Sequence, residues 1–228
     1  MVYFKSDFNE FFKELAANNH KLWFDENRQR YIQNIKAPFE AFVTALIADI
    51  QKFDPQMQID AKDSIFRINR DIRFSKDKTP YKLNRSAFIS PYGKKAGGYP
   101  GFYLQIGPEK VMIGGGVYQP NKDDLQKIRR YIISYTKKFQ RAISDPQFVE
   151  VYGELLGEKN KRLPSAEYTR AALEEPLIYN KQFYFMAEFP PEIITDNLFL
   201  DFVAEKFKDA LIVMDVLQEA TNRDNIDS

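Results

Sequence analysis

The apolar positions in the first fifty residues recur every three or four residues, which is the spacing of amphipathic helices. This pattern predicts a helix capped by Ser6 or Asp7, a second over about Lys21–Ile35, and a third that begins near Pro38. The apolar faces of the first and third helices are Phe8, Phe11, Phe12 and Leu15, and Phe39, Phe42, Val43, Leu46, Ile47 and Ile50.

The middle of the chain changes to a two-residue period, which is typical of half-buried strands. Strands are predicted over Ile65–Phe74, Ala87–Tyr92, Phe102–Ile106 and Val111–Tyr118, and within Leu177–Phe189. We expect Gly107–Lys110 to form the turn of a hairpin. Helical spacing returns over Asp123–Ile143, over Pro146–Leu156, and after Asp196 as far as Met214. Because helices lie on both sides of a block of strands, the prediction is an α+β fold with a mostly antiparallel sheet in the middle of the chain, packed by N-terminal and C-terminal helices.

The domain organisation follows from length and from the absence of internal breaks. A chain of 228 residues can bury one sizeable core, and the sequence contains no repeat and no low-complexity linker. We therefore expect a single domain over residues 1–228, with a frayed polar tail over residues 221–228.

Composition excludes several classes of site. The chain has no cysteine and one histidine, His20, so disulfides, thiolate-based metal centres and multi-histidine metal sites are excluded. We expect no cofactor and no metal. No apolar stretch is long enough to cross a membrane. Charged residues, namely Lys5, Asp7 and Glu10, stand where a signal peptide would need an apolar run. We therefore expect a soluble cytoplasmic protein without a membrane partner, and the sequence does not set its oligomeric state.

The charge of the chain indicates a candidate binding site only when it is counted over short segments. The net charge of the chain is +1, but residues 62–85 carry eight Lys or Arg against three acids. The aromatic residues Phe66, Phe74 and Tyr81 are interleaved with these cations. Such a concentration of positive charge is typical of an anion-binding site or of a buried ion-pair network.

Arg70 breaks the alternation of the predicted strand Ile65–Phe74, because it falls on the apolar side. Three explanations remain open. Arg70 pairs with a carboxylate, or a bulge shifts the register, or the guanidinium faces a ligand.

The candidate ligand-binding residues come from this basic segment and from the second predicted helix. Cations would hold an anion, and Tyr81 and Trp23 would supply aromatic walls. Trp23 and Asn27 also fit an alternative in which they pack into the core with their polar groups satisfied. The full set is Arg67, Arg70, Asp71, Arg73, Lys78, Tyr81, Lys82, Trp23 and Asn27.

The segment FRINRDIRFSKDKTPYK, from Phe66 to Lys82, resembles the signature F-R-x-x-R-D-x-R-F-S-x-D-K-x-P-Y-K of a widespread, mainly bacterial, uncharacterised family known as domain of unknown function 2461. The resemblance covers roughly residues 5 to 217. Outside the segment it extends to Asn18, Asn19, Trp23, Phe24, Asn27, Arg28, Tyr31, Phe102, Tyr103, Gly114, Gly116, Tyr118 and Pro120. It implies an intracellular α+β protein and brings no established activity with it.

Two functional hypotheses and one structural hypothesis remain. The first is binding of, or catalysis on, a small phosphorylated or carboxylated ligand in a basic, aromatic-lined pocket. The alternative is binding of nucleic acid or an acidic partner through the same patch; Asp63, Asp71 and Asp77 inside the patch make this less favoured. The third is a structural ion-pair network, with function elsewhere.

A nucleotide-binding loop at Gly114–Gly116 is not expected, because the G-K-[ST] and G-x-G-x-x-G patterns are absent. Close approach to a neighbouring strand, or a bulge, explains these glycines better.

Overall fold

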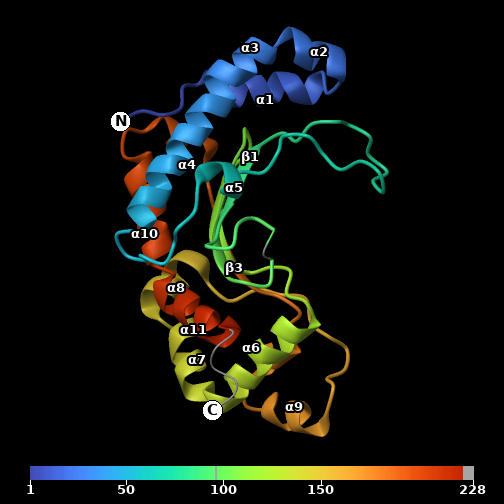
Figure 1. Cartoon of the computed structure of the whole chain (residues 1–228), viewed down its shortest axis with the longest axis vertical. Coiled ribbons are helices and arrows are strands. Elements are labelled where there is room, and N and C mark those ends of the chain that lie inside the picture. Colours follow the sequence, from blue (N-terminus) through green and yellow to red (C-terminus); the bar gives the residue numbers. More distant parts are fainter. Residues whose placement is uncertain (96, 223–228) are drawn as a thin grey trace. The chain divides into compact units, whose positions relative to one another are not determined.

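The computed structural model describes residues 1–95 and 97–222 (Figure 1). Of the tail that we predicted to be frayed, residues 223–228 lie outside the described residues. The chain divides into two compact units, which are described separately. The first unit comprises Met1–Lys94, Tyr103–Ile113 and Glu188–Glu205, and the second comprises Lys95–Phe102, Gly114–Ala187 and Lys206–Ser228.

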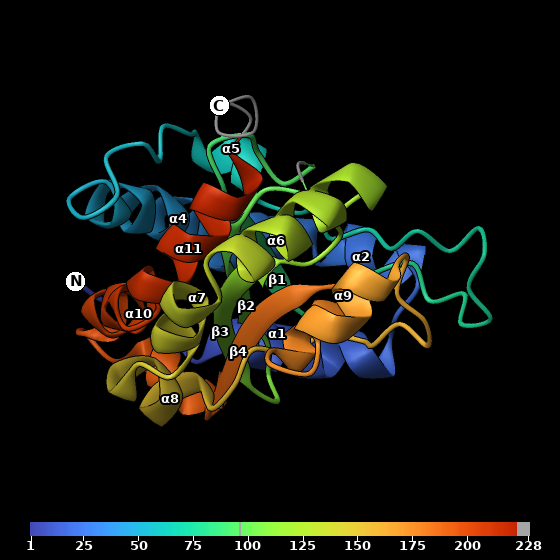
Figure 2. The ribbon, with the colours of Figure 1, turned by 90° about the horizontal axis from the view of Figure 1, so that it is seen from below.

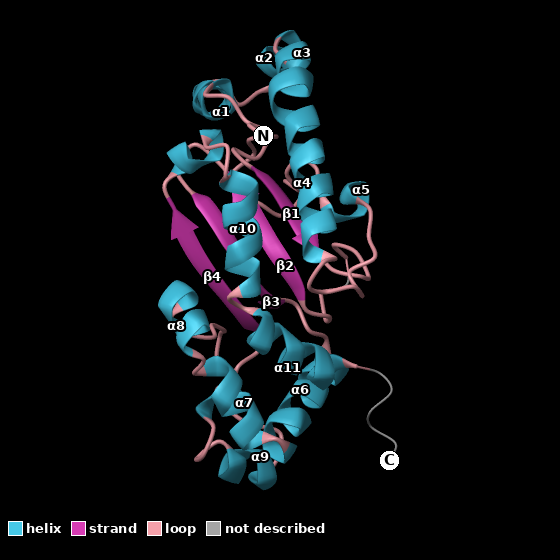
Figure 3. Ribbon diagram, turned by 90° about the vertical axis from the view of Figure 1, so that its left-hand side faces the viewer, coloured by secondary structure: helices cyan, strands magenta, loops and turns pink. Residues whose placement is uncertain are grey.

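The strands form one four-stranded antiparallel sheet (Figure 3, magenta). Its order is β1 (Arg85–Ile89), β2 (Gly101–Ile106), β3 (Val111–Val117) and β4 (Phe183–Phe189). The predicted hairpin is confirmed, since β2 and β3 are neighbours and the Gly107 N–H donates to the Lys110 carbonyl over 3.2 Å. The predicted α+β class, with helices at both ends of the chain, is therefore confirmed.

Close backbone approach explains the glycines of β3. A Cβ atom on Gly114 would lie 2.2 Å from the Phe185 carbonyl oxygen of the neighbouring strand β4. At Gly116 the same atom would lie 2.3 Å from the Phe183 oxygen, and its φ of +105° is rarely adopted by residues with a side chain. Strand packing thus requires glycine at both positions.

Helices of the first unit cover residues 7–64 and 191–208. They are α1 (Asp7–Ala17), α2 (Lys21–Glu26), α3 (Arg28–Tyr31), the π-helix η1 (Ile32–Lys36), α4 (Ala37–Ile50), α5 (Ala61–Ser64), the 3-10 helix η3 (Pro191–Thr195) and α10 (Phe199–Lys208), whose last three residues belong to the second unit. The predicted helix over Lys21–Ile35 is wrong in its continuity, because it is interrupted at Asn27. The Asn27 side chain and its backbone N–H both donate to the Trp23 carbonyl over 3.0 Å.

Phenylalanine rings build the core of the first unit. Phe42 of α4 stacks on Phe199 of α10, with 5.0 Å between ring centroids, and Phe4 contacts Phe42 at 5.2 Å. Phe8 and Phe12 of α1 are fully buried beside them. The apolar faces predicted for the first and third helices are confirmed, since every residue assigned to them is buried.

The second unit contains the remaining helices. They are α6 (Lys122–Ser134), α7 (Thr136–Ile143), α8 (Pro146–Tyr152), α9 (Ala166–Ala171), the 3-10 helix η2 (Pro176–Tyr179) and α11 (Leu211–Thr221). Figure 2 shows α11 beside α6 and α7, against which it packs. The predicted helix Asp123–Ile143 is wrong in its continuity, because Tyr135 leaves helical geometry with φ −128° and separates α6 from α7. The last predicted helix is likewise divided into α10 and α11 before Leu211.

Residues 66–84 form an arm that extends from the first unit between α5 and β1 (Figure 1, teal). The predicted strand Ile65–Phe74 is wrong, because this part of the chain makes only two isolated bridges, Ile65 with Ala87 and Asn69 with Tyr81. Between the bridges, three residues on one side face five on the other. The two additional residues act as a bulge, which prevents a regular ladder.

No helix in the described part of the chain has the length and apolar character that a membrane crossing would require.

Candidate functional site

Arg70 is held by an ion pair within the arm. Its Nη1 donates to the Asp77 carboxylate and to the Thr79 hydroxyl. Asp77 also accepts from the Thr79 backbone N–H over 2.9 Å. The hydrogen bond from Arg70 is the main cause that lowers the pKa of Asp77 to about 2, with further help from Thr79. Of the three explanations for Arg70, the structure therefore shows the carboxylate pair.

Arg73 and Lys78 are also engaged inside the arm. Arg73 binds Asp71 in a two-pronged contact, with Nε–Oδ1 3.0 Å and Nη2–Oδ2 2.7 Å. This hydrogen bonding lowers the pKa of Asp71 to about 2. Lys78 donates through Nζ to the Ile72 carbonyl over 2.9 Å. Three of the five predicted cations thus contact partners belonging to the arm itself.

Tyr81 anchors the base of the arm to the helices of the first unit. It is buried and stacks on Phe24 of α2. The Asn19 side chain binds the Tyr81 backbone twice, accepting from its N–H over 3.1 Å and donating to its carbonyl over 2.9 Å. A residue that we predicted as an aromatic wall is therefore a packing residue of the arm base.

Trp23 and Asn27 have local partners in the helical region. The Trp23 ring lies 5.5 Å from the ring of Phe11, centroid to centroid, and Asn27 binds the Trp23 carbonyl. Both side chains are half-buried, and these contacts lie within the helical region of the first unit.

Three cations remain where the arm joins the sheet, namely Arg67, Lys82 and Arg85, and we refer to them as the basic cluster. Among the described residues, none of the three forms an ion pair with a carboxylate. Lys82 Nζ lies 5.2 Å from the ring centroid of Phe66, and the Arg85 guanidinium carbon lies 5.4 Å from that of Phe39. Aromatic faces thus provide contacts to two of these cations.

The positive charges of Arg67 and Arg85 act on Lys82. Burial lowers the pKa of the half-buried Lys82 ammonium, and the positive charges of Arg85 and Arg67 lower it further. Burial also lowers the pKa of Arg85, against the opposite effects of Tyr31 and Glu40. The pKa of the buried Tyr31 hydroxyl is raised, mainly because it is removed from water. The basic cluster therefore holds positive charge that nearby acids only partly balance.

Arg85 is the member that the sequence interpretation missed. It begins β1, is only 4% exposed, and its buried Nε has no hydrogen-bond partner among the described residues. A buried donor without a partner costs about 1–3 kcal/mol. No local signal marked it, because Ser86 separates Arg85 from the apolar stretch of the strand and we predicted that strand to begin at Ala87.

A π-helix lies next in the sequence to a residue that interacts with the basic cluster. Tyr31, which interacts with Arg85, immediately precedes η1 (Ile32–Lys36), and η1 continues directly into α4 with Phe39 and Glu40. Single π turns inside helices occur frequently at functional sites. This backbone feature lies beside the same residues that surround the cluster.

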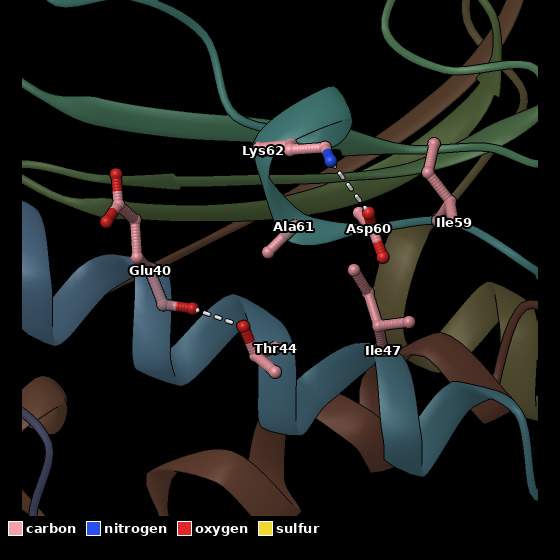
Figure 4. Close-up of a pocket in the computed structure, with 7 residues that line it drawn as sticks. All are labelled: Glu40, Thr44, Ile47, Ile59, Asp60, Ala61 and Lys62. Carbon is pink, nitrogen blue, oxygen red and sulfur yellow. Dashed lines mark hydrogen bonds and ion pairs between the residues drawn. The ribbon is translucent and has the colours of Figure 1, made fainter.

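A cavity of about 390 Å³ lies between α4 and the segment that leads into α5 (Figure 4). Its lining residues are Glu40, Thr44, Ile47, Ile59, Asp60, Ala61 and Lys62. None of the nine predicted site residues lines it. The ammonium of Lys62 pairs with Asp60 at 3.1 Å, which leaves Glu40 as a further acid in the lining. The cavity therefore lacks the surplus cation that an anion requires.

Comparison with known proteins places the chain in a family. No curated protein matches the sequence. A family model described as conserved hypothetical protein (DUF2461) matches residues 7–215, which include the arm, the basic cluster and most of both units. This chain belongs to the DUF2461 family of conserved hypothetical proteins.

Proposed function

We propose that the protein binds a small anionic ligand, phosphorylated or carboxylated, through the basic cluster of Arg67, Lys82 and Arg85. The observation that carries the proposal is the buried Arg85 guanidinium, whose Nε lacks a partner among the described residues, next to a second cation without a carboxylate. An uncompensated buried charge is costly, so a bound anion would stabilise this arrangement.

The chemistry of the cluster suits a phosphate or carboxylate group. Guanidinium groups bind both in a two-pronged manner, and an ammonium adds a compact charge. Arg67 is exposed and Lys82 is half-buried, so these two side chains offer donors to a ligand that arrives from solvent. Arg85 contributes charge from a buried position, and Phe66 provides an apolar wall beside Lys82. Such a mixture of apolar lining and a few convergent polar groups is typical of small-molecule sites.

The other predicted residues take supporting roles in this proposal. Arg70, Asp71, Arg73 and Lys78 hold the arm in shape. Arg73 pairs with Asp71, Arg70 pairs with Asp77, and Lys78 binds the Ile72 carbonyl. Tyr81 fixes the position of the adjacent Lys82 by its contact with Phe24. Trp23 and Asn27 stabilise the helices on which the arm base rests.

We also propose a cytoplasmic location for this binding activity. The chain has no cysteine, so it does not depend on the disulfide chemistry of an oxidising compartment.

A thermal-shift titration with inorganic phosphate and with citrate tests the proposal. A ligand present at 100 times its Kd stabilises a protein by about 2.7 kcal/mol, so a specific anion should raise the Tm measurably. Lys82→Met should abolish this rise, whereas Lys137→Met, which changes an exposed lysine of α7 outside the cluster, should preserve it. Equal stabilisation of the Lys82 variant and the unmodified protein, with each anion, would contradict the proposal.

A further inference from the structure

The ring of Phe74 is 93% exposed, although it lies in the middle of the arm that extends from the first unit. Its described neighbour is Arg73, whose guanidinium carbon lies 5.7 Å from the ring centroid. Exposing a phenylalanine ring to water is unfavourable, since burying such a side chain is worth roughly 1.5–3 kcal/mol relative to exposure. An aromatic residue displayed in this way indicates a contact surface.

The residues around Phe74 carry a net positive charge once each nearby aspartate has been matched with its arginine. Asp71 is matched by Arg73, and Asp77 by Arg70. The exposed Lys76 and Lys78 then remain as surplus cations, and neither forms an ion pair within the described residues. The partner of this surface must therefore carry negative charge and a flat apolar group.

A strand of unpaired nucleotides has both properties. Bases stack on exposed aromatic rings, while the phosphates pair with nearby lysine and arginine side chains. One ring is too small an apolar area for a stable interface with a folded protein or for insertion into a lipid bilayer, which needs several apolar side chains. We propose that the middle of the arm, from Arg73 to Lys78, binds single-stranded nucleic acid, with a base stacked on Phe74 and phosphates contacted by Lys76 and Lys78.

This surface is distinct from the basic cluster, because Arg73 to Lys78 include none of Arg67, Lys82 and Arg85. The two proposals can therefore fail separately. Phe74→Ala should leave the thermal shift caused by phosphate unchanged, whereas Lys82→Met should abolish that shift and retain the stacking contribution of Phe74.

Fluorescence anisotropy with a labelled oligothymidylate about twelve nucleotides long tests the inference on the full chain. We expect binding at ~50 mM salt that weakens at least tenfold by ~200 mM, because phosphate contacts release counterions. Phe74→Ala should weaken binding by about 5- to 150-fold, and Phe74→Trp should restore it, since every aromatic ring can stack on a base. Lys76→Glu should also weaken it and make the loss with salt less steep, because one phosphate contact fewer releases counterions.

Matched controls lie in the second unit. Leu173→Ala removes another apolar side chain that is 87% exposed, and Lys137→Glu makes the same charge change as Lys76→Glu on an exposed helical lysine. Neither should alter binding by more than about twofold. Three results would overturn the inference: no binding at ~50 mM salt, an affinity of Phe74→Ala equal to that of the unmodified protein, or a Phe74-dependent binding to vesicles with anionic lipids but not to the oligonucleotide.

Discussion

Tyr81 stacks on Phe24 with 4.0 Å between ring centroids and only 17° between ring planes. The pair joins the returning segment of the arm to helix α2, and Tyr81 lies directly before Lys82 in the sequence. Asn19 binds both backbone groups of Tyr81 from the same helical region. The position of the basic cluster therefore depends on a packed aromatic contact, and this dependence leads to the first prediction.

Tyr81→Ala should destabilise the first unit by about 3 kcal/mol, because truncating a buried aromatic residue leaves a cavity. Asn19→Ala should cost less, about 1–2 kcal/mol, since it removes two hydrogen bonds from a partly buried site. Urea unfolding measures both. If the ring contact did not hold the arm, Tyr81→Ala would lower stability without changing hydrogen exchange of the arm amides.

Lys82→Met should stabilise the protein in the absence of anions. The native pKa of Lys82 is lowered by burial and by Arg85 and Arg67, so the unfolded chain holds this proton more tightly than the native state does. Protonated Lys82 therefore opposes folding, and stability should rise as the pH increases through the lowered native pKa. Replacing the ammonium by an apolar group of similar length should add a few tenths to about 1 kcal/mol after solvent screening.

The measurement is the Tm at neutral pH in a buffer without phosphate, with Lys76→Met as the matched control. That control should change the Tm little, because Lys76 is exposed. A loss of stability in Lys82→Met would mean that the existing aromatic and backbone contacts already balance the charge.

The arm should lose order in acid. The pKa of Asp77 is lowered to about 2 by Arg70 and Thr79, and that of Asp71 to about 2 by Arg73. For an acid whose native pKa is depressed, the stabilising contribution is present above the ordinary pKa near 3.8 and is lost as the pH falls through about 2. Hydrogen exchange of the Thr79 amide, which donates to Asp77, should therefore lose protection between about pH 4 and pH 2.

Asp77→Asn provides the control for this pH effect. The amide keeps an oxygen for the Thr79 N–H but carries no charge for Arg70, so its Thr79 amide should be less protected at neutral pH and should respond little to acid. A pH dependence in the variant equal to that of the unmodified protein would show that other groups control the order of the arm.

The features that could be predicted from the sequence are those that depend on neighbours in the chain. The helical faces containing Phe8 and Phe42 and the β2–β3 hairpin follow from periodicity and turn residues. The helix breaks at Asn27 and Tyr135 do not interrupt the apolar period, and were therefore missed. The arm has alternating residues but lacks a strand, because alternation does not reveal a bulge between two bridges.

The candidate site could be located from its charge but not resolved into pairs. The surplus of cations over residues 62–85 indicated the segment that contains the basic cluster. Which cation meets which acid depends on the turn of the arm, and this turn brings Asp77 to Arg70 across seven positions. Arg85 could not be assigned without the start of β1, since its burial depends on packing against Phe39 of a distant helix.

The glycines of β3 permit a graded test of the sheet. A methyl group on Gly114 would lie 2.2 Å from the Phe185 oxygen and 2.9 Å from the Met186 sulfur, so β3 and β4 would have to separate. Gly114→Ala should therefore destabilise the protein by about 2–3 kcal/mol, the usual cost of overpacking at a site that cannot relax. At Gly107, in the hairpin turn, the nearest atom would lie at 3.2 Å, and Gly107→Ala should cost less than Gly114→Ala. Urea unfolding of the two variants measures the difference, and equal midpoints would show that β4 is not held against β3 as closely as the distances indicate.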